Sequence, residues 1–462
     1  MRSKMQKRWT ALVAVMLLLL VVAPLSGVDF RRVSAAGDFT VTDTGVLTEY
    51  TGSGGQVTIP SGVKRIHTGA FHSNTKITGV TFPSTLTEID PYAFRGCTGL
   101  TSVALPSSLI TIGAHAFYEC SNLISVKLSV QLTTIGNGAF AYCPKLTKFD
   151  TASCTRFKDE KGVLYRNWAS VVAAPAASVV SINSGATSIQ EEAFEGNTNL
   201  RTVILSTNMK TVGAYAFRDC SYMYSINLPD SVTSVGTGAF SGCEALPSIS
   251  VSKNLTKLPE EMFKNCTALT SVKLNAGTTG IGIGAFEGCT ALKTVTLPDG
   301  LTTIGNRAFR GTSSLNSVTL PSSLQYIYDN AFEKSGLTAV TLPASVVLKE
   351  CESAFQNCAS LKSVTFMGKA GEGIAKGMCK GCTALTGIRI PDGMTYIGVS
   401  AFEGCTSLSS VGIPDSVITI SASAFEGCTA LTSIQIPDGI TYIGSSAFAK
   451  TSLTSATLSD NV

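Results

Sequence analysis

The sequence predicts a repeat solenoid, a β-rich fold in which coils of about 23 residues stack so that their short strands run parallel. Three observations predict it. A phenylalanine recurs at a nearly constant interval, each unit repeats one short alternation of apolar and polar residues, and each unit has turn-forming residues at the same place. A single unit is too small to bury its own apolar side chains, so the core must form between units.

The recurring phenylalanine usually belongs to an Ala-Phe pair. Thirteen of the fifteen intervals are 23 residues; one is 24, between Met378 and Phe402, and one is 54, between Phe140 and Phe194. With parallel strands about 4.8 Å apart, sixteen coils predict a solenoid on the order of 75 Å long. The aligned residues are Phe71, Phe94, Phe117, Phe140, Phe194, Phe217, Phe240, Phe263, Phe286, Phe309, Phe332, Phe355, Met378, Phe402, Phe425 and Phe448.

The unit from Phe286 to Ala308 shows how each part of the repeat works. Residues 292–297 (LKTVTL) alternate closely enough to predict a short strand with one buried face. Residues 298–300 (PDG) predict a turn, because proline fixes φ and offers no donor to continue a ladder, and glycine accepts positive φ. Residues 301–305 (LTTIG) supply a second apolar pair before the next aromatic residue.

These units resemble the BspA-like type of leucine-rich repeat proteins, whose pattern is AFxGCTxLxxVxLPxxLxxIGxxA. The resemblance extends from about Val41 to the C-terminus and is nearly complete in 402–424 and 425–447. It implies a leucine-rich repeat solenoid and a secreted or cell-surface protein, since several family members are linked to adhesion and host contact. Because solenoids carry many unrelated binding roles, the resemblance is more specific for fold than for function.

Residues 1–35 are expected to be a signal peptide that is cut after Ala35. A basic start (residues 1–8) precedes an apolar run (Ala11 to Ala23), and small residues at 33–35 suit a signal peptidase. The alternative is an uncleaved anchor, because Trp9 to Leu25 is 17 residues long, at the short limit of a membrane span. We then expect a capping region with the first strand at 36–70, and the solenoid at 71–462.

Charge and composition exclude several function classes. Without the leader the net charge falls from +4 to −1, and only 14% of the residues are charged, which argues against nucleic-acid binding. The three histidines, His67, His72 and His115, occupy unrelated repeat positions, and no HExxH or GxSxG motif is present. We therefore predict no catalytic residue, no cofactor and no metal ligand, and a non-enzymatic protein that is secreted or at the cell surface without a membrane span in the mature chain.

Eleven of the fourteen cysteines share one repeat position. Equivalent side chains in stacked coils lie about 4.8 Å apart, whereas a disulfide needs Cβ atoms near 3.8 Å, so we predict a ladder of buried, reduced thiols. The ladder residues are Cys97, Cys120, Cys143, Cys220, Cys243, Cys266, Cys289, Cys358, Cys382, Cys405 and Cys428.

Three cysteines, Cys154, Cys351 and Cys379, lie off this ladder. One hypothesis gathers Cys351, Cys358, Cys379 and Cys382 into a zinc site. The favoured interpretation keeps Cys358 and Cys382 in the ladder and treats Cys351 and Cys379 as substitutions in irregular coils. A redox role for the Cys379–Cys382 CxxC pair has no βαβ context to support it.

Two stretches interrupt the repeat. An insertion at about 150–185 contains FKDEKGVLYRNWAS (157–170), which predicts a hairpin that carries Trp168. Trp168 is either an aromatic contact on a protruding finger or part of a local packing variant, and the second is favoured. The glycine-rich residues 367–378 lack a phosphate-loop motif and predict a solvated loop.

The outward positions of the strands predict a hydroxyl-rich, nearly uncharged binding face. The first hypothesis is an adhesin-like protein that binds an extracellular protein or glycan there, weakly and many times over. The second is a structural or self-associating array component, because residues 457–462 follow a repeat strand without a polar capping coil. The candidate face comprises Ser271, Lys273, Thr294, Thr296, Ser317, Thr319, Ser363 and Thr365.

Overall fold

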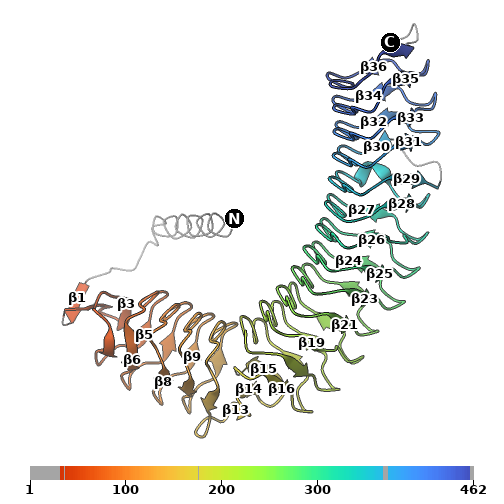
Figure 1. Cartoon of the computed structure of the whole chain (residues 1–462). Helices are drawn as coiled ribbons and strands as arrows, with labels where there is room; N and C mark the ends of the chain where they lie inside the picture. Colours follow the sequence, from red (N-terminus) through yellow and green to blue (C-terminus); the bar gives the residue numbers. More distant parts are fainter. Residues whose placement is uncertain (1–31, 36, 175, 368–372, 458–462) are drawn as a thin grey trace.

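The computed structural model describes residues 32–35, 37–174, 176–367 and 373–457. It confirms a β-solenoid of about 18 turns that curves into an open arc, with its strands in two rows (Figure 1). One row of strands, which we call the outer row, lies on the convex side of the arc. The other row, the inner row, leads into the turns that hold the Ala-Phe pairs, and these turns lie on the concave side. Most of the predicted leader (residues 1–35) lies outside the described residues, and only its last four residues are described, as the strand β1 (Arg32–Ala35).

The inner row contains one short element from each turn. Its members are β3 (Val46–Tyr50), β5 (Arg65–Ile66), β7 (Glu88–Ile89), β9 (Thr111–Ile112), β11 (Thr134–Ile135), β15 (Ser170–Ala173), β17 (Ser188–Ile189), β19 (Thr211–Val212), β20 (Ser234–Val235), β22 (Lys257–Leu258), β24 (Gly280–Ile281), β26 (Thr303–Ile304), β27 (Tyr326–Ile327), the 3-10 helix η1 (Leu348–Glu350), β30 (Gly373–Ile374), β32 (Tyr396–Ile397), β34 (Thr419–Ile420) and β36 (Tyr442–Ile443). The inner row has eighteen members, two more than the sixteen coils expected from the recurring phenylalanine. The two additional turns, those of β3 and β15, lack this phenylalanine, which we call the ladder phenylalanine.

The outer row contains the strands predicted from the LxxVxL segments. Its members are β4 (Gly55–Thr58), β6 (Ile77–Thr81), β8 (Ser102–Ala104), β10 (Ser125–Lys127), β12 (Lys148–Asp150), β16 (Val179–Ser181), β18 (Thr202–Ile204), β21 (Ser248–Ser250), β23 (Ser271–Lys273), β25 (Thr294–Thr296), β28 (Ala339–Leu342), β29 (Ser363–Phe366), β31 (Gly387–Arg389), β33 (Ser410–Gly412), β35 (Ser433–Gln435) and β37 (Ser455–Thr457). Four further strands are antiparallel to their neighbours: β1 (Arg32–Ala35) and β2 (Phe39–Thr42) at the start, and β13 (Phe157–Glu160) and β14 (Val163–Arg166) in the insertion.

A column of stacked phenylalanine rings fills the core behind the inner turns. Ring centroids in neighbouring coils are 4.6 to 5.9 Å apart, and the planes are close to parallel. Phe309, for example, is fully buried between Phe286 and Phe332, with centroids 5.1 and 5.0 Å away. Each ring therefore supplies contact area to two coils at once, and the column fixes the spacing of the stack.

The cysteine ladder is confirmed, and all fourteen cysteines are free and buried. Each of the eleven ladder thiols donates a hydrogen bond to a backbone carbonyl in the preceding coil; Cys243 Sγ, for example, lies 3.2 Å from the carbonyl oxygen of Phe217. Burial raises the pKa of the Cys97 and Cys143 thiols to about 12. The small thiol therefore fills the space beside the ring column and satisfies a carbonyl at the same time.

The structure corrects the alignment at Met378. The Phe355 backbone N–H donates to the carbonyl of Met378, whereas the Phe332 N–H donates to the carbonyl of Ala354. Met378 therefore occupies the alanine position and Cys379 the phenylalanine position, so the 24-residue interval precedes Cys379. The sequence alignment placed Met378 at the phenylalanine position because methionine is large and apolar.

The favoured interpretation of Cys358 and Cys382 as ladder residues is also confirmed. Their thiols donate to the carbonyls of Phe332 and Phe355, at 3.0 and 3.1 Å. Each of these two thiols thus has a partner that belongs to the repeat.

The insertion forms the predicted hairpin and one strand more. β13 and β14 pair around Lys161 and Gly162, and β14 and β15 pair around Asn167 and Trp168, with positive φ at all four turn residues. Mirror-image turns of this kind match the twist of antiparallel strands. β15 then pairs parallel with β17, which returns the chain to the inner row. Trp168 is 46% exposed, and its role as a contact residue stays a prediction.

The hydrophobic core divides at this insertion. One cluster of buried side chains runs from Leu47 to Ala173, and a second runs from Val163 to Ala447. On the inner side, however, the coil of Phe140 adjoins the coil of Phe194 directly, because the Tyr142 N–H donates to the carbonyl of Glu195 at 3.0 Å. The inner turns of the two halves therefore remain in contact across a 54-residue interval.

No helix among the described residues has the length and apolar character that a membrane crossing requires.

We expect the native protein to show almost no reaction with a thiol reagent at pH 8 and all fourteen thiols to react after denaturation. Buried thiols with a raised pKa carry too little thiolate to react. Titration with a chromogenic disulfide before and after guanidinium treatment measures both numbers. A denatured count close to zero would show that the cysteines are oxidised and would contradict the ladder.

The Phe309→Ala substitution should lower the free energy of unfolding by about 3–5 kcal/mol, because it leaves a cavity between two stacked rings. Urea unfolding followed by circular dichroism measures the loss. Thr296→Ala, on the exposed side of β25, is the control and should change stability by less than about 0.5 kcal/mol. Equal effects of the two substitutions would contradict a stabilising ring column.

Candidate functional site

All eight residues of the predicted face are exposed on the outer side of the solenoid. β23 pairs with β25 so that Ser271 lies beside Thr294 and Lys273 beside Thr296. Ser317 and Thr319 follow in the next coil, in a segment that forms no strand. Ser363 and Thr365 lie farther along, on β29. The structure therefore brings four of the eight directly together and places the others along the same outer face.

Four exposed aliphatic and tyrosine side chains in three successive coils, which we call the aromatic patch, lie on this face just after the insertion. Val179 and Ile204 on β16 and β18 are 56% and 55% exposed, and Tyr222 and Tyr224 in the next coil are 52% and 53% exposed. The Arg201 guanidinium lies over the Tyr222 ring, 4.7 Å from its centroid. Sequence reasoning missed this patch. The signal was present, since Val179 and Ile204 occupy positions that hold hydroxyl or other polar residues in most coils.

Two open grooves adjoin each other farther along the outer face, with volumes of about 580 and 450 Å³. Arg389 on β31 and Asp392 line both. Gly387 and Gly412 keep the first groove open, and Thr365 of the predicted face lines the second. The outer face thus carries grooves lined by one basic and one acidic side chain in addition to its hydroxyl columns.

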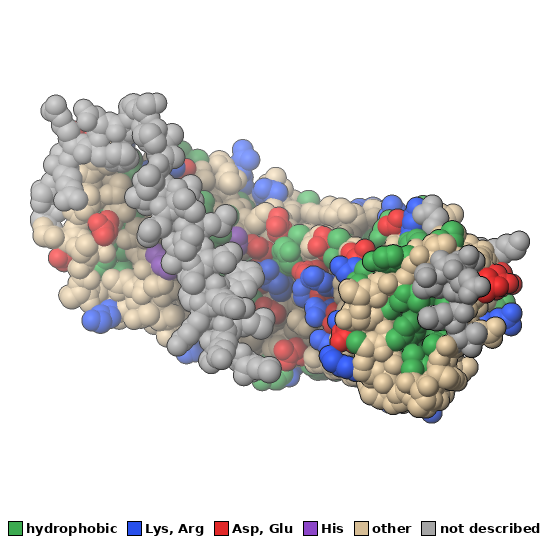
Figure 2. Space-filling view, turned by 90° about the horizontal axis from the view of Figure 1, so that it is seen from above, with side chains coloured by type: hydrophobic (Ala, Val, Ile, Leu, Met, Phe, Trp, Pro, Cys, Tyr) green, Lys and Arg blue, Asp and Glu red, His purple; other side chains and the backbone are tan. Residues whose placement is uncertain are grey.

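The inner face differs in character from the outer face. Figure 2 shows acidic and basic side chains gathered along its middle. Many belong to the position after the ladder phenylalanine: Lys264 and Arg310 contact Glu287 at 3.5 and 3.2 Å, and Arg310 contacts Glu333 at 2.7 Å. Alternating charge at one repeat position thus builds an ion-pair ladder whose side chains are 9% to 33% exposed.

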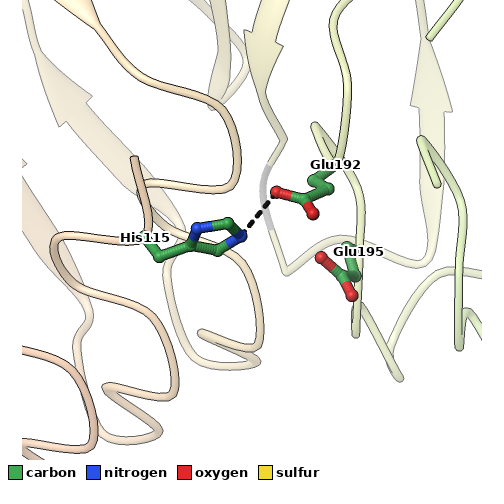
Figure 3. Close-up of side chains that lie close together, drawn as sticks. All are labelled: His115, Glu192 and Glu195. Atoms are coloured by element: carbon green, nitrogen blue, oxygen red, sulfur yellow. Dashed lines mark ion pairs between the residues drawn. The ribbon is translucent and has the colours of Figure 1, made fainter. Parts of the chain in front are cut away.

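A polar cluster of His115, Glu192 and Glu195 lies on this inner face where the two halves meet (Figure 3). His115 and Glu192 occupy the same repeat position, two residues before Phe117 and Phe194, and both have positive φ. The His115 Nε2 atom lies 2.7 Å from Glu192 Oε2. The side chains are 18%, 10% and 0% exposed, in the order His115, Glu192, Glu195.

The cluster leaves buried polar atoms without hydrogen bonds. Of seven such side-chain atoms in the described part of the chain, four belong to these three residues, including His115 Nδ1 and both oxygens of Glu195. Two of the four atoms do have ion-pair partners: Glu192 Oε2 contacts His115 Nε2, and Glu195 Oε1 contacts the Arg218 guanidinium. His115 Nδ1 and Glu195 Oε2 remain without a hydrogen bond. Burial raises the pKa of the Glu195 carboxyl to about 7, against the opposing effect of Arg218.

Chemically, an imidazole and two carboxylates can share a proton or bind a cation. One nitrogen or oxygen atom from each residue lies within 4.8 Å of the others, and no other group of three or more potential ligands among the described residues meets this criterion. Sequence reasoning missed the cluster because it compared the histidines only with one another. Placing every residue in its repeat column would have shown His115 and Glu192 at one position, although not that the inner turns stay adjacent across the insertion.

The comparisons with known proteins concern the repeat. The model of the BspA type leucine-rich repeat region matches residues 49–161, 176–293, 279–405 and 372–462. No curated protein matches. A leucine-rich repeat protein of Bacteroides ovatus is similar in structure, with 24% identity, a TM-score of 0.52, and coverage of 78% of this chain and 82% of that one.

A leucine-rich cell surface protein of Faecalibacterium prausnitzii also matches, with 20% identity, a TM-score of 0.37, and coverage of 74% of this chain and 96% of that one. The likeness to the Bacteroides ovatus protein supports the fold alone. The family model, in contrast, covers most of the chain with its own repeat pattern. The protein therefore belongs to the BspA type leucine-rich repeat family.

Proposed function

We propose that this protein is secreted or displayed at the cell surface and binds an extracellular protein through the outer face of its solenoid. The observation that carries the proposal is the aromatic patch. Exposed apolar side chains that are concentrated in one region of a soluble protein mark interaction sites more often than single ones do, and this patch places four of them in three successive coils. Tyrosine and arginine are also the residue types that dominate binding energy at protein interfaces.

The remainder of the outer face suits the rim of such an interface. The exposed hydroxyls at Ser271, Thr294 and Thr296 can form hydrogen bonds at a constant spacing and add little charge that would need to be desolvated. A partner that extends along the solenoid would add many weak contacts to the central patch and gain affinity through their number. Trp168 is a further candidate contact.

A protein ligand is favoured over a glycan by the composition of the patch. Its aliphatic members, Val179 and Ile204, add apolar area that offers a sugar neither a hydrogen bond nor an aromatic ring to stack on, whereas a protein partner can bury it against its own apolar side chains. The proposal assigns no catalytic activity to the chain.

The double substitution Tyr222→Ala with Tyr224→Ala should weaken binding to the ligand at least tenfold, because it removes the aromatic centre of the patch. The measurement is surface plasmon resonance against a panel of extracellular-matrix proteins and glycans. A second variant changes Thr294, Thr296, Ser317 and Thr319 to lysine and tests the hydroxyl face separately.

The matched control is Tyr442→Ala, since Tyr442 is 58% exposed but lies on β36 in the inner row. Saturable binding that both test variants retain would contradict the outer face as the binding surface. Binding to glycans alone would contradict the choice of a protein ligand.

Self-association is the competing use of the same patch. Sedimentation velocity at increasing concentration should show a monomer throughout if the patch binds a foreign protein. Oligomers that disappear in the double tyrosine variant would instead assign the patch to contacts between copies of this chain and favour the array hypothesis.

A further inference from the structure

We propose that His115, Glu192 and Glu195 form a binding site for a divalent transition-metal cation, with zinc the best fit, and that the bound cation joins the two halves of the solenoid. The site lies on the inner face, apart from the proposed binding surface, and neither proposal depends on the other. Four observations carry it: a gap that lets the side chains meet, their burial, the local charge and the ligand set.

The gap is created by Gly138. This glycine occupies the repeat position of His115 and Glu192 in the coil between them. A Cβ atom added there would lie 2.3 Å from Glu192 Oε2 and 3.0 Å from His115 Nε2. Only the absence of a side chain at this position therefore allows residues from coils two apart in the stack to converge.

Glu195 is more deeply buried than the other ion-paired glutamates at its repeat position, which range from Glu333, 9% exposed, to Glu403. The Glu195 side chain has no exposed surface, whereas Glu403, at the same repeat position, is 28% exposed and paired with Lys380 at 2.8 Å. A buried carboxylate that is only partly partnered is costly, and that cost falls when a cation coordinates the free oxygen. Arg218 pairs with one oxygen of Glu195, and the other oxygen, Oε2, has no hydrogen bond and is available to a cation.

The surrounding charge favours a cation. The inner turns from Arg95 to Asp219 hold two basic groups and five carboxylates. Arg218 pairs with Glu195, and Arg95 pairs with Glu119 at 3.3 Å, which leaves three carboxylates without a basic partner if the histidine is neutral. The charged residues are Arg95, Glu119, Glu191, Glu192, Glu195, Arg218 and Asp219.

The ligand set selects the class of metal. Imidazole nitrogen suits zinc and neighbouring transition metals, whereas magnesium and calcium prefer oxygen ligands alone and more of them. One histidine and two carboxylates supply three ligands, and a water molecule would complete a tetrahedral zinc site. The 4.8 Å limit on the ligand atoms exceeds the separation of about 3.3 Å across a tetrahedral zinc ion, so rotation of the glutamate side chains must close the set.

The position of the site gives the cation a structural role. His115 precedes Phe117 of the first core cluster, and both glutamates flank Phe194 of the second. A metal bound to all three would therefore link the two halves at the place where the apolar core is divided. Binding to the folded state alone would raise stability by mass action.

The test is isothermal titration of zinc chloride into the purified protein after treatment with a chelator. One site should fill, and His115→Ala and Glu195→Gln should each weaken zinc binding at least tenfold. The matched controls are His72→Ala, a histidine outside the cluster, and Glu403→Gln, at the same repeat position as Glu195. Both controls should bind zinc as the unaltered protein does.

Gly138→Ala tests the gap without removing a ligand. It should abolish zinc binding, whereas Gly284→Ala should not, because Gly284 occupies the same repeat position with φ of +57° and its nearest neighbour to an added Cβ is 3.3 Å away. Both substitutions place alanine at a positive φ, so strain alone affects them equally. Circular dichroism identifies any variant that fails to fold. If Gly138→Ala fails to fold, the zinc affinity of Glu195→Gln, which keeps the side-chain shape, tests the site instead.

Thermal unfolding supplies a second readout. Zinc at one hundred times its dissociation constant should raise the melting temperature of the unaltered protein and of both controls, and should leave Glu195→Gln unchanged. Equal zinc affinity in His115→Ala, Glu195→Gln and the unaltered protein would overturn the proposal, as would the absence of any saturable binding. Tighter binding of calcium than of zinc would overturn the choice of metal.

Discussion

The structure depends on one constraint, the stacking of each coil on the next at a constant rise. The backbone enforces it at the inner turns, where the N–H of one ladder phenylalanine donates to the carbonyl before the next, as from Phe286 to Ala308 at 2.8 Å. The ring column and the thiol ladder then fill the space that this spacing leaves. Because no coil buries its apolar side chains alone, a fault in one coil is felt by both neighbours.

The same constraint turns the surface into columns. A residue type repeated at one position forms a continuous line, such as the hydroxyls of β23 and β25 or the alternating charges around Glu287. A residue that differs from the rest of its column therefore changes the surface locally, and the difference is also visible in the sequence. Tyr222 and Tyr224 replace small and polar residues of their columns and expose apolar area, and Gly138 breaks a line of side chains and opens a gap. Function is best sought at such departures.

The repeat made most of the fold predictable from sequence, because local periodicity and coil stacking carry the same information. The strands, the thiol ladder and the hairpin at Lys161 all follow from short-range patterns. Two features did not follow. Cys379 was misplaced because a hydrophobic side chain was taken as the mark of the ring column, although the hydrogen-bond ladder defines it. The His115 cluster depends on how the chain closes a 54-residue interval, which no local pattern records.

The location of that cluster follows from the stacking constraint. Within a regular stack, every inner-turn side chain has neighbours of its own column, and apolar or oppositely charged partners satisfy it. The insertion ends this regularity. The coil of Phe140 meets the coil of Phe194 at the inner turns and through Asn199, which donates to the Pro144 carbonyl, while β13 and β14 join through β15 to the sheet that continues in β17, β19 and β20. The buried apolar side chains divide into two clusters at this place. A contact that is strong and short in range is needed there, and metal coordination by side chains from both halves provides one.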